Sequence, residues 1–264
     1  MNGNVIAIVN EKGGVGKTNT SLAAAYALAR AGKDFFILEI DSSNDSGSEL
    51  HKSEVLKDRV QSVNLDKAND ALSSAIFKVL TSDTTVIIDA GASGDTRDVI
   101  KKIRDLELEN VSWCIPIQNS LKQMQNLRST YKLIDDSENT YVVKNQVNTD
   151  EDYLQTNDDY IFFEGSKRYG RKSVRKELEL ESLNVIEIPR SEMFELAESS
   201  NETLYDIAQL AVEYSPKEAR EIFAELGEAE FIENMARFSV AQQSFKLLSR
   251  LEKEFGILIH ESEA

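Results

Sequence analysis

The sequence has 264 residues, of which 41% are apolar and 29% are charged, a composition that suits one sizeable α/β domain with its own core. Its formal net charge of −16 repels nucleic acid and anionic lipid, so DNA binding would require a local basic patch or a partner protein. The N-terminus has no basic region and its apolar run has only a strand's length, so we expect neither a signal peptide nor a membrane span. The single cysteine, Cys114, lies in an apolar run and indicates a buried position in a cytoplasmic protein.

Apolar runs of strand length alternate with helical stretches along most of the chain. The runs cover residues 5–9, 35–40, 85–88, 111–117, 141–143 and 185–188. Runs this apolar, separated by helices, indicate a mostly parallel sheet covered on both faces, and therefore the doubly wound α/β class. A strand-like stretch at 60–65 lies between two short helical patterns that the sequence does not order. We expect the acidic, polar residues 148–159 to form a surface loop.

A glycine-rich stretch, Asn-Glu-Lys-Gly-Gly-Val-Gly-Lys-Thr at residues 10–18, follows the first strand and opens a helical stretch. Its glycines allow positive φ angles, so that successive backbone N–H groups converge on phosphate oxygens. Lys17 is placed to reach the β and γ phosphates, and Thr18 supplies the hydroxyl that such loops place on Mg²⁺. The positive end of the helix dipole adds to this anion site. We therefore expect ATP contacts from Lys12, Gly13, Gly14, Val15, Gly16, Lys17, Thr18 and Asn19.

The stretch departs from the ordinary Walker pattern, because Glu11 occupies its first glycine position and a second lysine, Lys12, precedes the paired glycines. In this it resembles the deviant Walker A ATPases of the ParA/MinD family, closest to the partition branch. The resemblance implies that Lys12 reaches the phosphates bound by the other subunit of an ATP-dependent homodimer, and that Lys12 and Lys17 are catalytic. The nitrogenase iron protein has a similar loop but needs cysteine pairs for its iron–sulfur cluster, which a single cysteine excludes.

Two of the expected strands end in a carboxylate, Asp41 and Asp89. By the same resemblance, Asp41 orients or activates the attacking water, and Asp89 is the Walker B carboxylate that holds Mg²⁺ through water. We expect the metal site to comprise Thr18, Asp41 and Asp89. The prolines that the family usually has after both carboxylates are absent, although Gly91 and Gly94 can still form a mobile switch. A local role as a cap or turn carboxylate stays open for both aspartates.

Three later stretches extend the resemblance to about residue 210. Residues 115–118 are similar to the family's strand that ends in Pro-Val-Gln, and residues 141–145 resemble the strand whose terminal Asn meets the adenine edge. Residues 188–190 resemble the Ile-Pro-Arg that precedes the loop lining the base. The resemblance therefore adds Asn145, Pro189 and Arg190 to the expected ATP-binding residues.

Residues 166–176, the basic segment, contain six basic residues, no acidic residue and one tyrosine. In an otherwise acidic protein this is the best anion surface, and in partition ATPases basic residues of this neighbourhood contribute to non-specific DNA binding. A solvated helix start, balanced by the glutamates at 177, 179 and 181, is an equally good interpretation. The DNA-binding candidates are Lys167, Arg168, Arg171, Lys172, Arg175 and Lys176.

Ser215-Pro216 is a helix-start signal after a break, so we expect a P-loop ATPase domain at 1–214 and a helical extension at 215–264. In the extension Phe231, Met235, Phe238 and Phe245 recur at helical spacing. These helices either pack on the domain of the sheet or offer a surface to a dimer or partner.

The leading hypothesis is a cytoplasmic, ParA-like ATPase, associated with the nucleoid if it binds DNA, that dimerises on ATP and hydrolyses it slowly to position or segregate cargo, above all plasmid DNA. Its partners would be a second copy of itself, a DNA-binding adaptor protein and DNA without sequence preference. A membrane-cycling regulator like MinD is one alternative, but the chain ends in apolar and then acidic residues in place of a basic amphipathic helix. A metabolic P-loop enzyme is the other, and it would leave Lys12 without a role in trans.

Overall fold

A computed structural model describes residues 4–40, 56–64, 68–92, 94–108, 110–148, 160–181, 184–200 and 202–260. Within these ranges seven strands form one sheet in the order β3-β2-β4-β1-β5-β6-β7, and every pair of neighbours is parallel. The strands are β1 (Val5–Ile8), β2 (Phe35–Ile40), β3 (Val60–Val63), β4 (Thr85–Ala90), β5 (Val111–Ile117), β6 (Thr140–Val147) and β7 (Val185–Pro189). The doubly wound α/β class is confirmed, and residues 60–63 of the strand-like stretch form the edge strand β3 beside β2.

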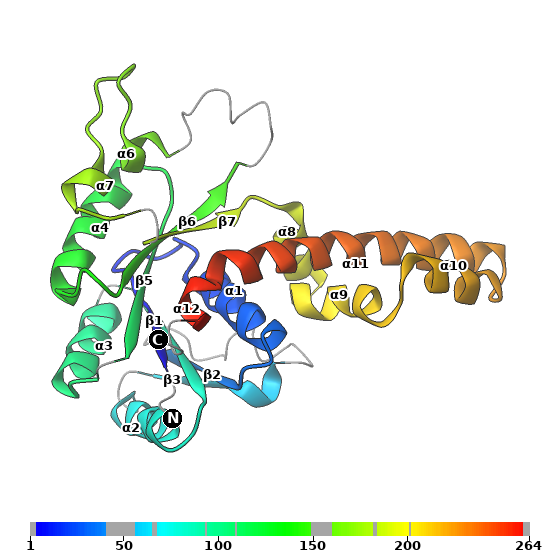
Figure 1. The fold of residues 1–264 in the computed structure, drawn as a ribbon, viewed down its shortest axis with the longest axis horizontal. Coiled ribbons are helices and arrows are strands. Elements are labelled where there is room, and N and C mark those ends of the chain that lie inside the picture. The colour runs from blue at the N-terminus through cyan, green and yellow to red at the C-terminus, as the bar shows by residue number, and fades with distance from the viewer. Residues whose placement is uncertain are drawn as a thin grey trace.

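Helices cover both faces of the sheet (Figure 1). The long ones are α1 (Lys17–Arg30), α2 (Ala68–Thr81), α3 (Gly94–Asp105), α4 (Leu121–Ile134), α8 (Glu192–Ser200), α9 (Leu204–Glu213), α10 (Pro216–Ala224) and α11 (Glu228–Phe255). The short ones are η2 (Lys57–Arg59), α6 (Ile161–Glu164), α7 (Val174–Glu177) and α12 (Ile257–His260). One apolar cluster joins the sheet to α2, α3, α4, α6 and α7, and a second joins it to α1, α8, α9, α11 and α12.

The central strand β1 shows why the strands could be recognised as unbroken apolar runs. Val5 and Ala7 belong to the first apolar cluster, whereas Ile6 and Ile8 belong to the second. Alternate residues of a strand point to opposite faces, so a strand covered on both faces needs apolar residues at every position. Cys114 of β5 is buried, as expected.

The C-terminal extension begins where the sequence indicates. Ser215 caps the N-terminus of α10, and a capping box pairs it with Glu218. From there α10 and residues 228–240 of α11, together the helical arm, extend away from the sheet (Figure 1). The rest of α11 lies against α1 and β7 and contributes Leu247, Leu251 and Phe255 to the second apolar cluster. The expectation that the extension packs on the domain of the sheet is therefore confirmed for this part of α11. A surface for a dimer or partner, and the division into domains at residue 214, stay predictions.

The helical arm has a small apolar core of its own. Ala219, Phe223 and Phe238 are buried there, and partly buried side chains of α9 and α11 pack around them. The rings of Phe223 and Phe238 meet edge to face, with their centroids 6.4 Å apart. No helix in the described ranges is both long and apolar enough to cross a membrane. Of the expected surface loop at 148–159, only Asn148 is among the described residues.

Candidate nucleotide-binding site

The glycine-rich loop lies between β1 and α1, at the carboxyl end of the central strand, where doubly wound folds bind their ligands. Asn10 is fully buried beneath it. Its side-chain amide donates a hydrogen bond to the carbonyl of Pro116 at 2.7 Å, and its side-chain oxygen accepts one from the backbone N–H of Lys12 at 2.9 Å. Asn10 therefore fixes the start of the loop to the end of β5.

Gly16 stands at the N-cap of α1 with a φ of 90°, a conformation that glycine adopts without strain. A Cβ atom at this position would also lie 2.8 Å from the side-chain amide of Asn145. That amide donates a hydrogen bond to the carbonyl of Val15 at 2.8 Å. Backbone conformation and close packing thus both require glycine here, and the predicted residues Val15, Gly16 and Asn145 are brought together.

The two lysines of the loop have different surroundings. The ammonium group of Lys17 lies 3.3 Å from the carbonyls of Asn10 and Lys12, so it is folded over the loop. The side chain of Lys12 is exposed, as are Gly13, Gly14 and Thr18, whereas Asn19 is half-buried. The open side of the loop therefore carries the backbone N–H groups and the hydroxyl expected to face a nucleotide.

Glu11, which occupies the first glycine position of the Walker pattern, anchors the loop from outside. Its carboxylate forms an ion pair with Arg97 of α3 and accepts a hydrogen bond from the hydroxyl of Ser129 of α4 at 2.8 Å. In the sequence, only the departure from the ordinary Walker pattern marks Glu11. Its two partners lie far along the chain and were not identified from the sequence.

Asp89 lies at the end of β4, directly opposite Glu39 of β2 in the sheet. Both carboxylates are buried, and Glu39 accepts a hydrogen bond from Ser62. Burial raises the pKa of Asp89 to about 7, and the negative charge of Glu39 adds to the increase, while hydrogen bonds from Ser21 and Thr18 and the charge of Lys17 oppose it. The sheet thus places two buried carboxyl groups side by side next to the loop.

The oxygen atoms at this place suit Mg²⁺, which prefers carboxylate, hydroxyl and water ligands. The Thr18 hydroxyl is close enough to the Asp89 carboxyl group to lower its pKa, so two of the three expected metal-site residues lie near each other. The third, Asp41, lies outside the described residues. The residues present fit a magnesium ion held by Thr18 directly and by Asp89 through water.

The segment after Asp89 is tied to the loop. The Thr96 hydroxyl lies 3.0 Å from the carbonyl of Asn10 and 2.6 Å from that of Gly91. The backbone N–H of Gly91 donates to the carbonyl of Ile40 at 2.6 Å. Any shift of the segment around Gly91 would therefore strain or break hydrogen bonds at the base of the loop and at the end of β2.

Asn145, Pro189 and Arg190 lie at the ends of β6 and β7, on the same edge of the sheet as the loop. The backbone N–H of Arg190 donates to the carbonyl of Val147 at 2.8 Å, which joins the two strand ends. Pro189 is buried and Arg190 is exposed. Of the three, Asn145 is the residue with a described contact to the loop.

The basic segment forms a tight turn followed by a short helix. Backbone hydrogen bonds in both directions join Ser166 and Arg171, and Gly170 turns with a φ of 60°. All its basic residues are exposed except Arg175, which pairs with Glu164 at 3.5 Å and also donates to the carbonyl of Leu180. The interpretation as a helix start balanced by nearby glutamates holds only in part, because Glu177 pairs with Arg128 of α4, which lies outside the basic segment.

Comparisons with known proteins identify the family of the chain. The family model AAA_31, described as an AAA domain, matches residues 3–164. The sporulation initiation inhibitor protein Soj of Bacillus subtilis is 33% identical over 85 residues, which are 32% of this chain and 28% of Soj.

Among solved structures, the MinD cell division protein of Aquifex aeolicus is 15% identical and has a TM-score of 0.50, over 92% of this chain and 97% of that one. A putative plasmid partition protein of Borrelia burgdorferi bound to AMPPNP is 13% identical and has a TM-score of 0.46, over 74% of this chain and 90% of that one.

Proposed function

The chain belongs to the AAA_31 family, within the ParA/MinD group of P-loop ATPases, and we propose that it dimerises on ATP and hydrolyses it slowly to position or segregate cargo. The cargo that we favour is plasmid DNA. The observation that carries the proposal is the contrast between the two lysines of the loop. Lys17 folds over its own loop, whereas Lys12 is exposed and available to the nucleotide of a second subunit.

Each part of the loop would have a distinct role in hydrolysis. The backbone N–H groups of residues 13–18 and the start of α1 would bind the phosphates, and Lys17 would neutralise charge at the β and γ phosphates. Mg²⁺, held by Thr18 and Asp89, would offset the charge that develops on the transferred phosphoryl group. Asp41 would orient the attacking water. Asn145, with Pro189 and Arg190 nearby, would contact the base.

The test separates ATP binding from dimerisation. Lys17→Ala should lose ATP binding in calorimetry, because it removes the charge at the β and γ phosphates. Lys12→Ala should retain ATP binding in cis but form no ATP-dependent dimer in size-exclusion chromatography with light scattering. A Lys12→Ala protein that dimerises like the wild type would contradict the role in trans. Equal ATP affinity of Lys17→Ala and wild type would contradict the nucleotide site itself.

We further propose that the dimer binds DNA without sequence preference through the exposed cations of the basic segment. In a protein of net charge −16, attraction to a polyanion needs such a compact positive surface, and a dimer would present it twice. Arg175 supports the fold of the segment through its ion pair with Glu164, so it is a poor choice for a test.

The variant to make is therefore Arg168→Glu with Lys172→Glu. Its DNA affinity and the steepness of its salt dependence should both fall, while its ATP hydrolysis stays unchanged. Lys217→Glu with Arg237→Glu, on the exposed helical arm, is the matched charge control. If Arg168→Glu with Lys172→Glu binds DNA as tightly as the control variant and the wild type, a DNA-binding adaptor protein is the better candidate for the link to cargo.

A further inference from the structure

The strand that carries Asn145 is irregular just beyond this residue. The register between β6 and β7 shifts between Asn145 and Val147, and the intervening Gln146 has a φ of 59°. A bulge of this kind locally bends a strand and redirects its side chains. Asn145 approaches the loop on the face of α1, whereas its neighbour Lys144 contacts α6 on the opposite face.

Tyr160 fastens this irregular strand end. It is 2% exposed, and its hydroxyl donates to the carbonyl of Asn145 and lies 3.0 Å from that of Ile117 at the end of β5. Tyr160 itself has a φ of 58°. Gln146 and Tyr160, neither of which is glycine, thus both have left-handed backbone conformations at this contact. Such conformations are costly, and proteins retain them where the surroundings enforce them and often where function needs them.

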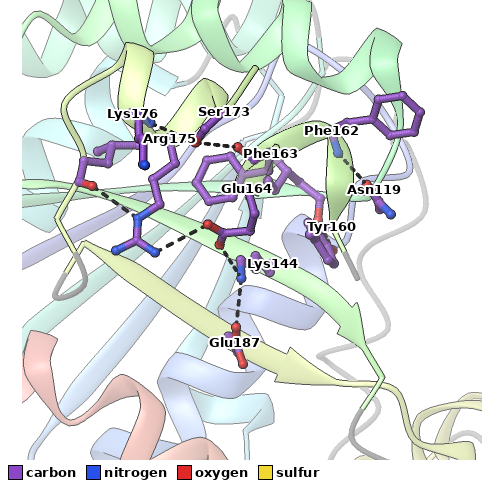
Figure 2. A network of polar contacts seen from close by, with 12 residues as sticks. Asn119, Lys144, Tyr160, Phe162, Phe163, Glu164, Ser173, Arg175, Lys176 and Glu187 are labelled. Carbon is purple, nitrogen blue, oxygen red and sulfur yellow. Dashed lines mark hydrogen bonds and ion pairs between the residues drawn. The ribbon is translucent and has the colours of Figure 1, made fainter. Parts of the chain in front are cut away.

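The ring of Tyr160 is held in turn by a network centred on Lys144, shown in Figure 2. The Lys144 ammonium lies 2.7 Å from a carboxylate oxygen of Glu164 and 2.9 Å from one of Glu187, and 5.5 Å from the centre of the Tyr160 ring. Arg175 pairs with the other oxygen of Glu164. Because Tyr160 is the N-cap residue of α6 and Glu164 is its last residue, these ion pairs fix the helix that places the tyrosine.

The charge state of Lys144 is secure. Burial by itself lowers the pKa of the ammonium group, but hydrogen bonds to Glu164 and Glu187 outweigh it, so the net shift is upward. Lys144 therefore stays charged, as its ion pairs with Glu164 and Glu187 require.

We infer that Tyr160 is a positioning residue that holds Asn145 against the loop and thereby sets how the protein distinguishes the base of its nucleotide. This inference rests on the proposed function, in which Asn145 contacts the adenine edge. Without the tyrosine hydroxyl, the carbonyl of Asn145 loses its partner and the bulge can relax. The side-chain amide then moves relative to Val15 and Gly16, with which it is in contact.

The test compares the affinities for ATP and for inosine triphosphate, which carries a carbonyl in place of the exocyclic amine of adenine. Tyr160→Phe keeps the ring and removes the hydroxyl, and should reduce the preference for ATP about fivefold, the scale of one lost hydrogen bond. Tyr131→Phe is the matched control, because that hydroxyl donates to the carbonyl of Leu178 at 3.2 Å, away from the loop. It should leave the preference unchanged.

Glu164→Gln provides a second variant if Tyr160→Phe fails to fold. It weakens the hold on α6 while Glu187 still pairs with Lys144, and should reduce the preference about twofold. A general loss of stability would lower both affinities together and leave their ratio constant. An unchanged ratio of the two affinities in both variants would overturn this inference and leave the proposed function standing. A wild type that binds ATP and inosine triphosphate equally well would do the same. A wild type that binds no ATP would overturn the proposed function and this inference with it.

Discussion

At the carboxyl edge of the sheet, side chains are held by polar contacts with distant parts of the backbone, whereas in the helical arm they are held by apolar contacts between two neighbouring helices. Asn10, Tyr160 and Thr96 each bond a carbonyl of another element. In the arm, Phe223 and Phe238 meet across α10 and α11. The first region tolerates few alternatives, because a misplaced polar group inside a protein is costly. The second requires only apolar side chains of suitable size.

The largest effect on ATP binding should follow from Gly16→Ala, which sharpens this contrast at the carboxyl edge. A methyl group would strain the backbone and collide with Asn145, so we expect ATP binding to be lost in calorimetry and unfolding free energy to fall by about 3 kcal/mol. Gly14→Ala is the control, because its φ is also positive but no atom lies within 4 Å of the added carbon. Equal losses of unfolding free energy in the two variants would show that the packing against Asn145 is unimportant.

The buried carboxylate of Asp89 should make the nucleotide-free protein less stable as pH rises. Its pKa in the folded protein, about 7, exceeds the ordinary value of 3.8, so the folded state binds the proton more tightly and its advantage disappears between pH 4 and 7. The full loss is about 4 kcal/mol at most. Urea unfolding at several pH values across this range, with a chelator present to remove Mg²⁺, measures this loss. Asp89→Asn should make the unfolding free energy less dependent on pH. If the wild type becomes more stable between pH 4 and 7 and Asp89→Asn does not, the raised pKa of Asp89 is wrong.

Phe238→Ala tests the other side of the comparison. Phe238 is 1% exposed, so its removal should cost the helical arm about 3 kcal/mol. Hydrogen exchange should speed up in α10 and residues 228–240, while ATP affinity stays within twofold of wild type. Ile232→Ala, at a position 63% exposed, should change neither quantity. If Phe238→Ala weakens ATP binding tenfold, the two regions are not independent.

The smallest effect concerns the contact between the end of α1 and the part of α11 that packs on the sheet. Arg30 of α1 pairs with Glu252 of α11 at 2.5 Å and lies over the ring of Phe245 at 4.7 Å. Arg30→Met should lower the unfolding free energy by about 1 kcal/mol in thermal melts, since both partners are partly exposed. The matched change, Arg237→Met, breaks an exposed pair on the arm and should have no measurable effect. A larger effect at Arg237 than at Arg30 would reverse this ranking.

The same contrast explains what the sequence could predict. The strands and the start of α10 follow from local patterns, an unbroken apolar run in one case and Ser-Pro with a glutamate in the other. The glycines and Lys17 are a local motif as well, and they lie where expected. The contact between Asn145 and the loop joins residues 130 positions apart, and it was not predicted, because the family resemblance indicated only that Asn145 meets the base.

The contacts that secure the site left no local pattern. Glu11 meets Arg97 and Ser129, which are 86 and 118 positions away, and Tyr160 reaches back 43 positions to Ile117. The basic segment shows the limit in another way. Its composition gives the sign of its charge, but not that Arg175 already has Glu164 as its partner.

Helix α11 has one half in the core and the other in the helical arm. Its 28 residues, at 1.5 Å per residue, give a rod of about 42 Å. Because its buried half lies against α1, whose N-terminus is the proposed phosphate site, a tilt of α1 would turn the whole rod. The far end of the rod would then move farther than its buried half, because the displacement under a rotation grows with the distance from the pivot.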